Sequence, residues 1–329
     1  MAVLVTGGAG YIGSHMVWKL LDEGEEVVVI DRLSTGFEWA VPPEAELVVG
    51  DIADQDLVEA TIARRNVDAI IHFAGSIIVP ESVADPLSYY LNNTVKSRAL
   101  IESAVRKGVP HFIFSSTAAV YGGKHGEPVT EDALTLPESP YGRSKLMTEM
   151  MLADVATAHP FAYTALRYFN VSGADPNGRT GQSTKGATHL IKVACETATG
   201  KRSSMDVYGT DYPTPDGTCI RDYIHVWDLV EAHYLALKRL RAGGESIVAN
   251  CGYGKGYSVL QVIDAVKRVV GHDFEVNVSG RRAGDPARIV ANADRARAEF
   301  GWGPRLDNID TIVLDALRWE EALKRRNNG

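Results

Sequence analysis

The sequence predicts an α/β fold in which a doubly wound parallel sheet carries a smaller, mixed C-terminal lobe. Three observations support this fold class. The first half alternates short apolar runs with longer amphipathic ones, which is typical of a parallel sheet covered by helices on both faces. A glycine-rich segment, residues 7–13, separates the first apolar run from the first amphipathic one. After Asn170 this rhythm ends, and Gly, Pro, Asp and Asn become frequent.

Six strands and four helices are expected before residue 171. The strands are short apolar runs rich in β-branched residues, at 2–6, 26–31, 46–50, 67–73, 111–115 and 161–166. The helices are longer amphipathic segments, at 13–22, 54–65, 86–107 and 141–159. Gly108 is expected to end the third helix, because glycine favours the position after a helix C-terminus.

The second half is expected to form shorter elements between turn-rich segments. Residues 172–188 and 211–217 are rich in Gly, Pro, Asp and Asn, which is typical of loops. Helices are expected at 188–200, 226–241, 259–270 and 310–325. The last of these ends in basic residues, which suit the negative end of a helix dipole.

Composition and charge exclude several classes of protein. Hydrophobic residues make up 45% of the 329 residues and charged residues 23%, which excludes a disordered chain. The net charge of −8 argues against binding to nucleic acid or to an anionic membrane. No apolar run reaches the roughly 18 residues that span a bilayer, and no signal peptide is evident. The three cysteines are far apart, so we expect free, buried thiols and a cytoplasmic location.

The glycine-rich segment has the properties of a phosphate-binding loop. Gly7, Gly10 and Gly13 lie between a predicted strand and a predicted helix. The missing Cβ lets backbone N–H groups approach a pyrophosphate, and the helix N-terminus attracts an anion. Asp31 ends the second strand about 20 residues further on, where a carboxylate can bind an adenosine ribose. Because this carboxylate would repel a 2′-phosphate, we expect NAD rather than NADP.

Two further segments follow strand ends at the same predicted edge of the sheet. Asp51 and Ile52 come after the third strand, and residues 73–75 come after the fourth. Ligands bind at the carboxyl ends of strands in open α/β sheets. Cofactor contacts are therefore expected here, with ordinary turn chemistry as the alternative.

A tyrosine and a lysine are one helical turn apart in the fourth predicted helix. Tyr141 and Lys145 lie four residues apart, so they share one face of the helix. The ammonium would stabilise a phenolate and lower the pKa of the tyrosine from about 10 toward neutrality, which would make Tyr141 a general base. Residues 115–117, Ser-Ser-Thr, follow the fifth strand and offer a hydroxyl for a substrate oxygen. A surface pair is the alternative for this spacing alone.

Together these motifs resemble the extended, sugar-nucleotide branch of the short-chain dehydrogenase/reductase superfamily. The resemblance is carried by TGGAGYIG, SST and YGRSK, and it covers nearly the whole chain. It narrows to the UDP-glucose 4-epimerase family through FSSTAAVYG, RYFNVSGA and YGTDYPTPDGTCIRDYIHV. The resemblance implies interconversion of UDP-galactose and UDP-glucose by transient oxidation at sugar C4, with tightly bound NAD.

The resemblance also implies roles for three catalytic residues. Tyr141 would take the proton of the sugar 4-hydroxyl while a hydride passes to NAD. Lys145 would lower the pKa of Tyr141 and hold the nicotinamide ribose, and Thr117 would bind the 4-oxygen. The 4-keto sugar would then turn over in the site and accept the hydride on its other face.

Two sets of binding residues are implied in the same way. Cofactor contacts are expected along the strand ends and on the catalytic helix, at Gly7, Gly10, Tyr11, Ile12, Gly13, Asp31, Asp51, Ile52, Phe73, Ala74, Gly75, Asn93, Ser115, Tyr141, Lys145 and Phe169. Substrate contacts are expected at Thr117, Tyr141, Asn170, Tyr208, Arg221, Arg282 and Asp285. Arginines suit a diphosphate in their own right, because guanidinium groups match phosphate oxygens, although a surface ion pair is the alternative for each.

The length of 329 residues corresponds to about two domains of roughly 150 residues. Residues 1–170 are expected to form the NAD-binding Rossmann domain, to which 221–252 return. Residues 171–220 and 253–329 are expected to form the lobe that binds the UDP-sugar. The family also implies a homodimer, in which the predicted helices 86–107 and 141–159 pair with their copies.

Three positions depart from the family pattern. Ile77 stands where many members carry a lysine that touches the cofactor pyrophosphate. Ile289 stands at the position that sets pocket size, where an aromatic residue restricts the pocket to UDP-glucose and UDP-galactose and a small residue admits N-acetylated sugars. Isoleucine is intermediate and leaves both open. His189 stands where asparagine is common near the nucleotide.

Several other functions use the same fold. An epimerase of UDP-N-acetylhexosamines or UDP-pentoses is the nearest alternative. A sugar-nucleotide dehydratase would need Asp-Glu after Thr117, where this chain has Ala118 and Ala119, so no carboxylate is placed to protonate a leaving hydroxyl. A net oxidoreductase would exchange its cofactor at every turnover, and a non-catalytic NAD-binding regulator would lack Tyr141 or Lys145. No metal site is expected, because the histidines lack metal-ligand spacing.

Overall fold

Seven strands form the larger sheet of the structure, a computed structural model that describes residues 1–123, 128–282 and 285–327. The strands are β1 (Ala2–Thr6), β2 (Glu26–Asp31), β3 (Glu46–Val49), β4 (Val67–His72), β5 (His111–Thr117), β6 (Ala162–Tyr168) and β10 (Ile247–Cys251). Their spatial order is β10-β6-β5-β4-β1-β2-β3, and every neighbouring pair is parallel. The chain therefore winds outward in both directions from β1 and β4, which confirms the predicted fold class.

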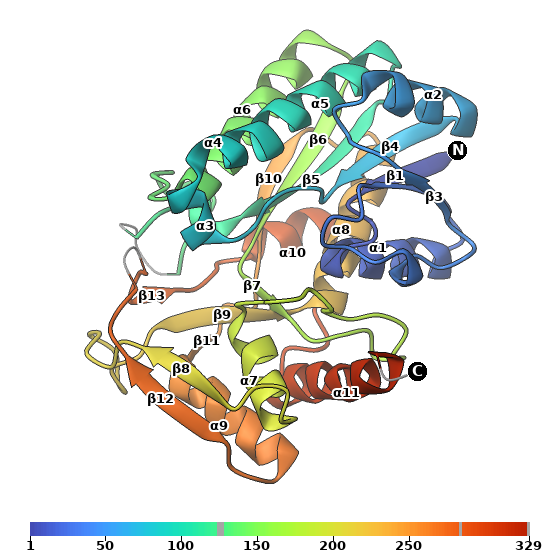
Figure 1. Ribbon diagram of the computed structural model, residues 1–329. Coiled ribbons are helices and arrows are strands. Elements are labelled where there is room, and N and C mark those ends of the chain that lie inside the picture. Colours follow the sequence, from blue (N-terminus) through green and yellow to red (C-terminus); the bar gives the residue numbers. More distant parts are fainter. Residues whose placement is uncertain (124–127, 283–284, 328–329) are drawn as a thin grey trace.

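Helices cover both faces of this sheet (Figure 1). One face carries α2 (Gln55–Arg65), α5 (Lys96–Arg106) and α6 (Pro140–Ala158). The other carries α1 (Tyr11–Asp22), α8 (Val226–Arg241) and α10 (Asp294–Phe300). Every residue of β1 and β4 is buried, because a parallel sheet covered by helices on both sides has no solvent-exposed face. The short loops at the carboxyl ends of these strands are what the fold leaves accessible to a ligand.

The helix predicted over 86–107 is a continuous run of three helical segments. These are α4 (Pro86–Tyr89), the π-helical segment η2 (Tyr90–Val95) and α5. A short helix that the sequence did not predict, α3 (Val79–Ala84), precedes them. The wider π-helical turn places Asn93 in the interior, while Leu91 and Val95 are each 54% exposed.

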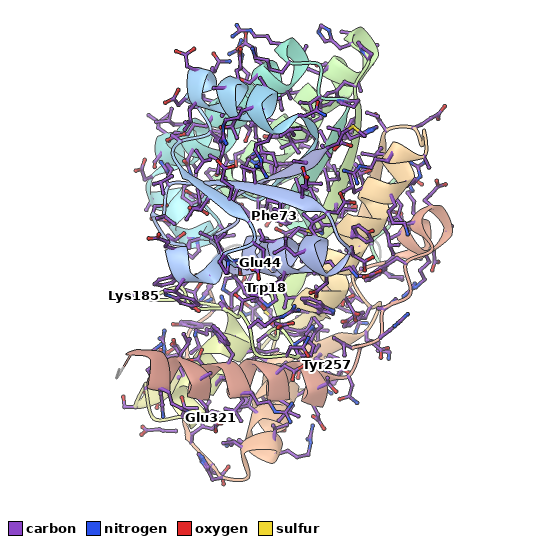
Figure 2. All side chains as sticks on the ribbon, turned by 90° about the vertical axis from the view of Figure 1, so that its right-hand side faces the viewer. Trp18, Glu44, Phe73, Lys185, Tyr257 and Glu321 are labelled. Carbon is purple, nitrogen blue, oxygen red and sulfur yellow. The ribbon has the colours of Figure 1, made fainter. Side chains whose placement is uncertain are left out.

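Two small sheets and three helices make up the lobe. The first sheet joins β7 (Asn170–Ser172), β9 (Ile220–His225), β11 (Gly256–Ser258) and β13 (Arg288–Ile289), with β9 in the centre. The second is the parallel pair β8 (Ser204–Tyr208) and β12 (Glu275–Ser279). The helices α7 (Leu190–Ala198), α9 (Val259–Val270) and α11 (Ile309–Asn327) pack against one another. In the side view of Figure 2, Phe73 and Trp18 belong to the upper layer, and Tyr257 and Glu321 lie in the lobe below.

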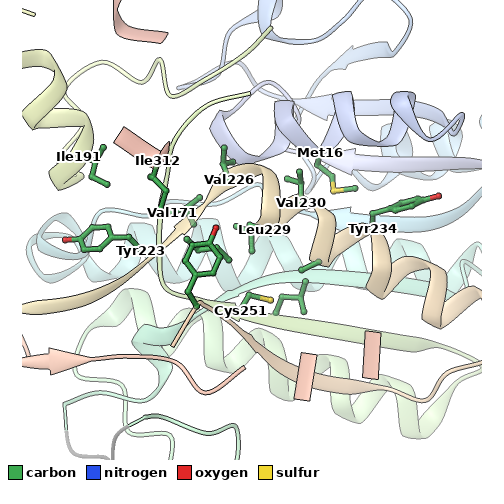
Figure 3. Close-up of a cluster of buried hydrophobic side chains, with 14 of the residues drawn as sticks. Met16, Val171, Ile191, Tyr223, Val226, Leu229, Val230, Tyr234, Cys251 and Ile312 are labelled. Atoms are coloured by element: carbon green, nitrogen blue, oxygen red, sulfur yellow. The ribbon is translucent and has the colours of Figure 1, made fainter. Parts of the chain in front are cut away.

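One cluster of buried apolar side chains joins the sheet layer to the lobe (Figure 3). Met16 of α1 and Leu229 of α8 belong to the sheet layer, whereas Val171 of β7, Ile191 of α7 and Ile312 of α11 belong to the lobe. A second cluster fills the opposite face of the sheet, beneath α2, α5 and α6. The shared cluster sets the position of the lobe relative to the strand ends where the predicted site lies.

The structure also bears on the predicted state of the cysteines and on the expectation that no segment spans a membrane. Cys195, Cys219 and Cys251 are free and buried, as predicted. Burial raises the pKa of Cys195 to about 12, so this thiol stays protonated and packs as a small apolar side chain. Within the described ranges, the structure has no helix with the length and apolar character needed to cross a membrane.

Candidate active site

The glycine-rich loop packs tightly against the chain that follows β4. Gly7 has a φ of +72°, and a Cβ built there would lie 2.7 Å from the amide nitrogen of Ala74. A Cβ on Gly13 would lie 2.1 Å from the carbonyl oxygen of Gly7. Among the described residues no side chain caps helix α1 at Gly10, so its first N–H groups remain available to an anion. The loop therefore fits the pyrophosphate of a dinucleotide.

Asp31 organises this loop from the end of β2. Its Oδ2 accepts a hydrogen bond of 3.0 Å from the N–H of Ala9, and its Oδ1 accepts one of 2.8 Å from the N–H of Leu33. Leu33 adopts a left-handed φ of 58°. Each carboxylate oxygen keeps further acceptor capacity, which is compatible with the predicted contact to a ribose.

Asp51 and Ile52 follow β3 and have structural partners of their own. Asp51 Oδ2 lies 2.5 Å from Lys96 Nζ and 3.4 Å from Arg32 Nη1. Burial acts to raise the pKa of Asp51, but the hydrogen bonds from Lys96 and the Ala53 N–H and the charges of Lys96 and Arg32 together outweigh burial and hold that pKa below its usual value. Ile52 is buried in the apolar cluster beneath α2 and α5. The predicted cofactor contact would add to these interactions.

Asn93 fastens the segment after β4 to helix α6. Its Oδ1 accepts a hydrogen bond of 2.7 Å from the N–H of Ser76, and its Nδ2 donates to the Ser76 carbonyl and to Ser144 Oγ at 2.9 and 3.1 Å. A Cβ on Gly75 would lie 3.0 Å from Asn93 Oδ1. Ile77, one of the three expected departures from the family pattern, is 50% exposed.

The three predicted catalytic residues meet at the carboxyl end of β5. Tyr141 and Lys145 are both buried on α6, and the Tyr141 hydroxyl shares a hydrogen bond with Thr117. Lys145 Nζ donates to the carbonyl oxygen of Ser115 at 3.0 Å and lies 4.9 Å from the centre of the Phe114 ring. A phenol, an ammonium and a hydroxyl thus lie beside the strand ends that flank the glycine-rich loop.

The structure does not show the predicted lowering of the tyrosine pKa. Burial raises the pKa of Tyr141 above its usual value, and the hydrogen bond with Thr117 lowers it only in part. The ammonium of Lys145 bonds instead to the Ser115 carbonyl. Burial lowers the pKa of Lys145 to about 8, although Glu149 acts to raise it. Desolvation disfavours both the phenolate of Tyr141 and the ammonium of Lys145. The sequence motif contains no information about how deeply these groups are buried.

Arg221 and Asp285, both predicted to bind substrate, form an ion pair in the lobe. Arg221 Nη2 lies 3.6 Å from Asp285 Oδ1, and Nη1 donates to the Pro286 carbonyl at 2.8 Å. Ile289 of β13 pairs in register with Arg221 of β9. Residues paired across neighbouring strands project to the same side of a sheet. Ile289, at the position expected to set pocket size, therefore lies next to Arg221.

The remaining predicted substrate residues lie at the edges of the lobe. The guanidinium of Arg282 stacks 3.7 Å from the centre of the Tyr208 ring. Asn170 begins β7 and pairs with Tyr223 of β9. Phe169, the last predicted cofactor contact, is buried in a small cluster that also contains Ile289.

Sequence reasoning missed several polar groups around the catalytic residues. Ser115 Oγ lies 2.5 Å from the hydroxyl of Tyr168, and Glu149 forms a bidentate ion pair with Arg167. Glu149 continues the spacing of Tyr141 and Lys145 by one more helical turn, and that signal could have identified it. Arg167 lies in an apolar strand and carries no comparable signal.

Comparisons with known proteins identify close relatives of this chain. A family model described as "NAD dependent epimerase/dehydratase family" matches residues 3–252. A UDP-glucose 4-epimerase of Azospirillum brasilense is 54% identical over 98% of this chain and 93% of the relative. The crystal structure of UDP-glucose 4-epimerase from Brucella ovis in complex with NAD has a TM-score of 0.94 at 43% identity, covering 96% of this chain and 97% of that one. The enzyme from Bifidobacterium longum in complex with NAD+ and UDP has a TM-score of 0.93 at 38% identity, with both chains fully covered.

Proposed function

The chain belongs to the NAD dependent epimerase/dehydratase family, and on that premise we propose that it interconverts UDP-galactose and UDP-glucose with tightly bound NAD. The observation that carries this proposal is the convergence of Tyr141, Lys145 and Thr117 beside a dinucleotide-type phosphate loop. The UDP-glucose 4-epimerases described above share nearly the full length of this chain.

Each catalytic side chain has one task in this mechanism. Thr117 holds the 4-oxygen of the sugar, and Tyr141 takes the proton of the 4-hydroxyl and later returns it. Lys145 is buried next to the end of β5, where its ammonium stabilises the phenolate that proton transfer requires. Held at its nicotinamide end by Lys145 and Ser115, NAD would supply the hydride acceptor and donor for sugar C4 and a positive charge near the Tyr141 hydroxyl.

The residues that would hold NAD lie along the strand ends around the point between β1 and β4 where the chain changes its direction of winding. The N–H groups at Tyr11, Ile12 and Gly13 face the pyrophosphate, and Asp31 binds the adenosine ribose. Lys145 and Ser115 bind the nicotinamide end. The tight packing of Gly7 against Ala74 supports this assignment, because it makes the loop rigid before the cofactor arrives.

The lobe supplies the UDP-sugar contacts in this proposal. Asn170, Arg221, Arg282 and Asp285 would bind the uridine diphosphate, and Ile289 would limit the size of the hexose. Residues 1–170 would hold NAD together with α8 and β10, because β9 lies in the lobe sheet and the chain returns to the sheet layer only at α8. The lobe, including Arg221 of β9, would hold the substrate. The free thiols at Cys195, Cys219 and Cys251 support a reducing compartment, and we propose the cytoplasm.

Incubating the purified protein with UDP-galactose is expected to yield UDP-glucose without added NAD. Because the hydride returns to the same sugar, the bound cofactor is regenerated in every cycle. Product is measured by chromatographic separation of the two sugar nucleotides, in parallel with UDP-N-acetylgalactosamine and a UDP-pentose. Conversion that depends stoichiometrically on added NAD would indicate a net oxidoreductase instead, and no conversion of any sugar would refute the epimerase proposal.

We also propose a homodimer built on an apolar stripe of the sheet layer. Val83, Leu87, Leu91 and Val95 follow one another at intervals of four residues and are 64%, 77%, 54% and 54% exposed. Helix α6 packs beside these segments and adds Met150, which is 56% exposed. Apolar exposure of this extent along neighbouring helices is typical of a surface that a partner covers, and a second copy offers the same stripe.

Replacing Leu87 with aspartate is expected to convert the dimer to a monomer, because a charge would be buried at the centre of the interface. Light scattering at micromolar concentration gives the mass. Val278→Asp is the matched control, because Val278 is 70% exposed but lies on β12 in the lobe. A monomeric mass for the unmodified protein, or an unchanged mass for Leu87→Asp, would contradict the proposed interface.

A further inference from the structure

Behind the catalytic residues lies a buried carboxylate that the proposed mechanism leaves unused. Glu149 lies on α6, four residues after Lys145, and is 5% exposed. Its Oε1 accepts hydrogen bonds from Ser116 Oγ at 2.5 Å and from Arg167 Nε at 3.0 Å, and its Oε2 accepts one from Arg167 Nη2 at 2.6 Å. The carboxylate thus ties one helix to two neighbouring strands.

These contacts lie directly beneath the groups that face the substrate. Ser116 of β5 and Arg167 of β6 are partners in the sheet register, so their side chains share one face. Ser115 and Thr117 flank Ser116 and project to the other face. The Ser115 carbonyl accepts from Lys145. A shift of Ser116 would therefore displace the acceptor of Lys145 and the hydroxyl of Thr117 together.

Arg167 is held in turn by a second set of contacts. Its Nη1 donates to the hydroxyl of Tyr121 at 3.1 Å, and its guanidinium lies 4.9 Å from the centre of that ring. Tyr121 donates onward to Asn250 Oδ1 at 2.6 Å, which lies on β10. The carboxylate is thus anchored through three adjacent strands, and a rigid support of this kind fixes the groups it touches.

Glu149 also places a negative charge one turn from Lys145. It opposes the effect of burial on the pKa of Lys145. The other ion in this region, Arg167 on β6, is already paired with Glu149. Burial lowers the pKa of His72 on β4 to about 3 and raises the pKa values of both neighbouring tyrosines. The titratable side chains that are neutral near pH 7 around the ammonium are therefore His72, Tyr141 and Tyr168.

We propose that Glu149 is a positioning residue for the Tyr141–Lys145 pair, which locks α6 to the carboxyl ends of β5 and β6 and keeps the Lys145 ammonium charged. This inference rests on the proposed function. It assigns to the Glu149–Arg167 pair a part in the reaction beyond support of the fold.

The test compares three variants with the purified holoenzyme. Glu149→Gln removes the charge but keeps the shape of the side chain. Because Arg167 is then buried without a counter-ion, the double variant Glu149→Gln/Arg167→Met removes both charges and safeguards folding. Ser116→Ala removes only the hydrogen bond to β5. The Lys145 ionisation is followed by NMR of the 13Cε resonance in lysine-labelled protein, assigned by its loss in Lys145→Met. NAD content and the pH profile of kcat are measured on the same samples.

Both charge variants are expected to lower the ionisation midpoint of Lys145, by about one pH unit in Glu149→Gln and by less in the double variant. The alkaline limb of kcat moves to lower pH by the same amount, so that kcat at pH 8 falls about fivefold in Glu149→Gln, given a Lys145 pKa of about 8 in the unmodified protein. Ser116→Ala is expected to lower kcat several-fold with an unchanged Lys145 midpoint, because it disturbs geometry and not charge.

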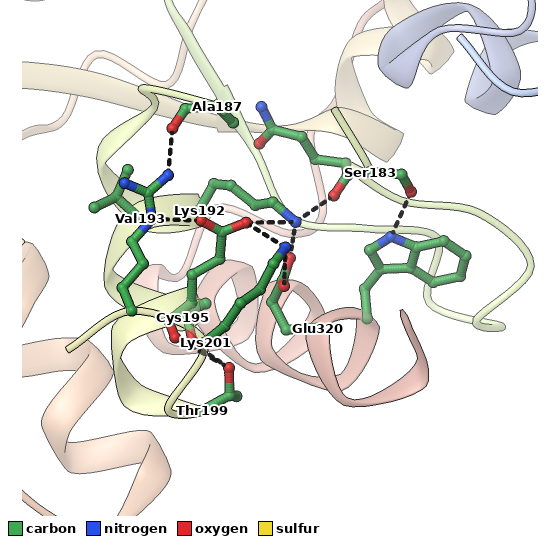
Figure 4. Close-up of polar contacts among 12 residues, drawn as sticks. Ser183, Ala187, Lys192, Val193, Cys195, Thr199, Lys201 and Glu320 are labelled. Carbon is green, nitrogen blue, oxygen red and sulfur yellow. Dashed lines mark hydrogen bonds and ion pairs between the residues drawn. The ribbon is translucent and has the colours of Figure 1, made fainter. Parts of the chain in front are cut away.

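A remote buried ion pair provides the matched control. Lys192 of α7 contacts Glu320 of α11 and donates to the Gln182 carbonyl at 2.7 Å (Figure 4). Lys192→Met/Glu320→Gln removes two buried charges from the lobe and is expected to lower the melting temperature without moving the Lys145 midpoint. A merely structural role for Glu149 would give the same pattern: lost stability with an unmoved midpoint and pH limb.

Two outcomes overturn the inference. One is an unchanged Lys145 midpoint in both charge variants, and the other is a Ser116→Ala variant with unaltered kcat. The proposed function fails separately, if the unmodified holoenzyme converts no UDP-galactose while the NMR titration still shows the shift.

Discussion

Replacing Tyr141 with phenylalanine is expected to lower the turnover of UDP-galactose by roughly 10²–10⁴-fold. The hydroxyl is the only part of the side chain that the change removes, and it is the group that we propose to take and return the proton of the 4-hydroxyl. Thr117, which shares a hydrogen bond with it, cannot replace it, because a hydroxyl of ordinary pKa is a poor base. The ring still packs, so NAD content and melting temperature are expected to stay close to those of the unmodified protein.

The measurement is kcat for UDP-galactose at saturating substrate, with NAD released from the protein and quantified by its absorbance. Tyr257→Phe is the matched control, since it removes a tyrosine hydroxyl from β11 in the lobe. Near-normal turnover in Tyr141→Phe would remove this residue as the base. Loss of NAD together with activity would show that the hydroxyl also holds the cofactor.

Replacing Gly13 with alanine is expected to deplete the protein of NAD. The added methyl group would lie 2.1 Å from the carbonyl oxygen of Gly7 and 2.9 Å from the Cα of Gly8. These are backbone atoms, so the loop itself must move. Overpacking costs about 1–3 kcal/mol, and a distortion of that size in the phosphate contacts weakens binding by roughly tenfold to a hundredfold.

NAD content after gel filtration and the melting temperature with and without added NAD report this effect. Gly303→Ala is the control, because a Cβ there meets nothing within 4 Å. Because the unmodified protein and Gly303→Ala already hold NAD, added NAD should change their melting temperatures little. It should raise the melting temperature of the depleted Gly13→Ala variant measurably. Full retention of NAD by Gly13→Ala would show that the pyrophosphate lies elsewhere.

The sheet layer could be predicted closely from the sequence because its signals are local. Continuous apolar runs such as 67–73 have few alternatives to a buried strand, and the predicted strand 26–31 coincides with β2. The glycine-rich loop and the spacing of Tyr141 and Lys145 are equally local. They were sufficient to identify the family and the side chains that the structure brings together at the end of β5.

The helices of the lobe were predicted, but its short strands and the electrostatics could not be, because both depend on contacts between distant segments. β7 and β13 contain three and two residues, too few to show a periodicity, and they form only because β9 lies between them. The helical run after Pro86 contains a π-helical segment that places Asn93 inward, and no residue pattern marks it. The pKa of Tyr141 depends on burial by the whole fold, and the partner of Glu149 comes from another strand.

The apolar cluster that runs from α1 and α8 into β7, α7 and α11 has a consequence for how ligands enter. A hinge motion that separated lobe from sheet would expose Met16, Leu229 and Ile312 to water at once, at about 25 cal/mol for each Å² uncovered. The lobe and the sheet layer are therefore expected to move as one rigid body. We therefore expect the sugar nucleotide to exchange through movement of the surface segments over the strand ends and not through a hinge motion of the lobe. A fixed lobe is compatible with the proposal that NAD stays bound through many cycles.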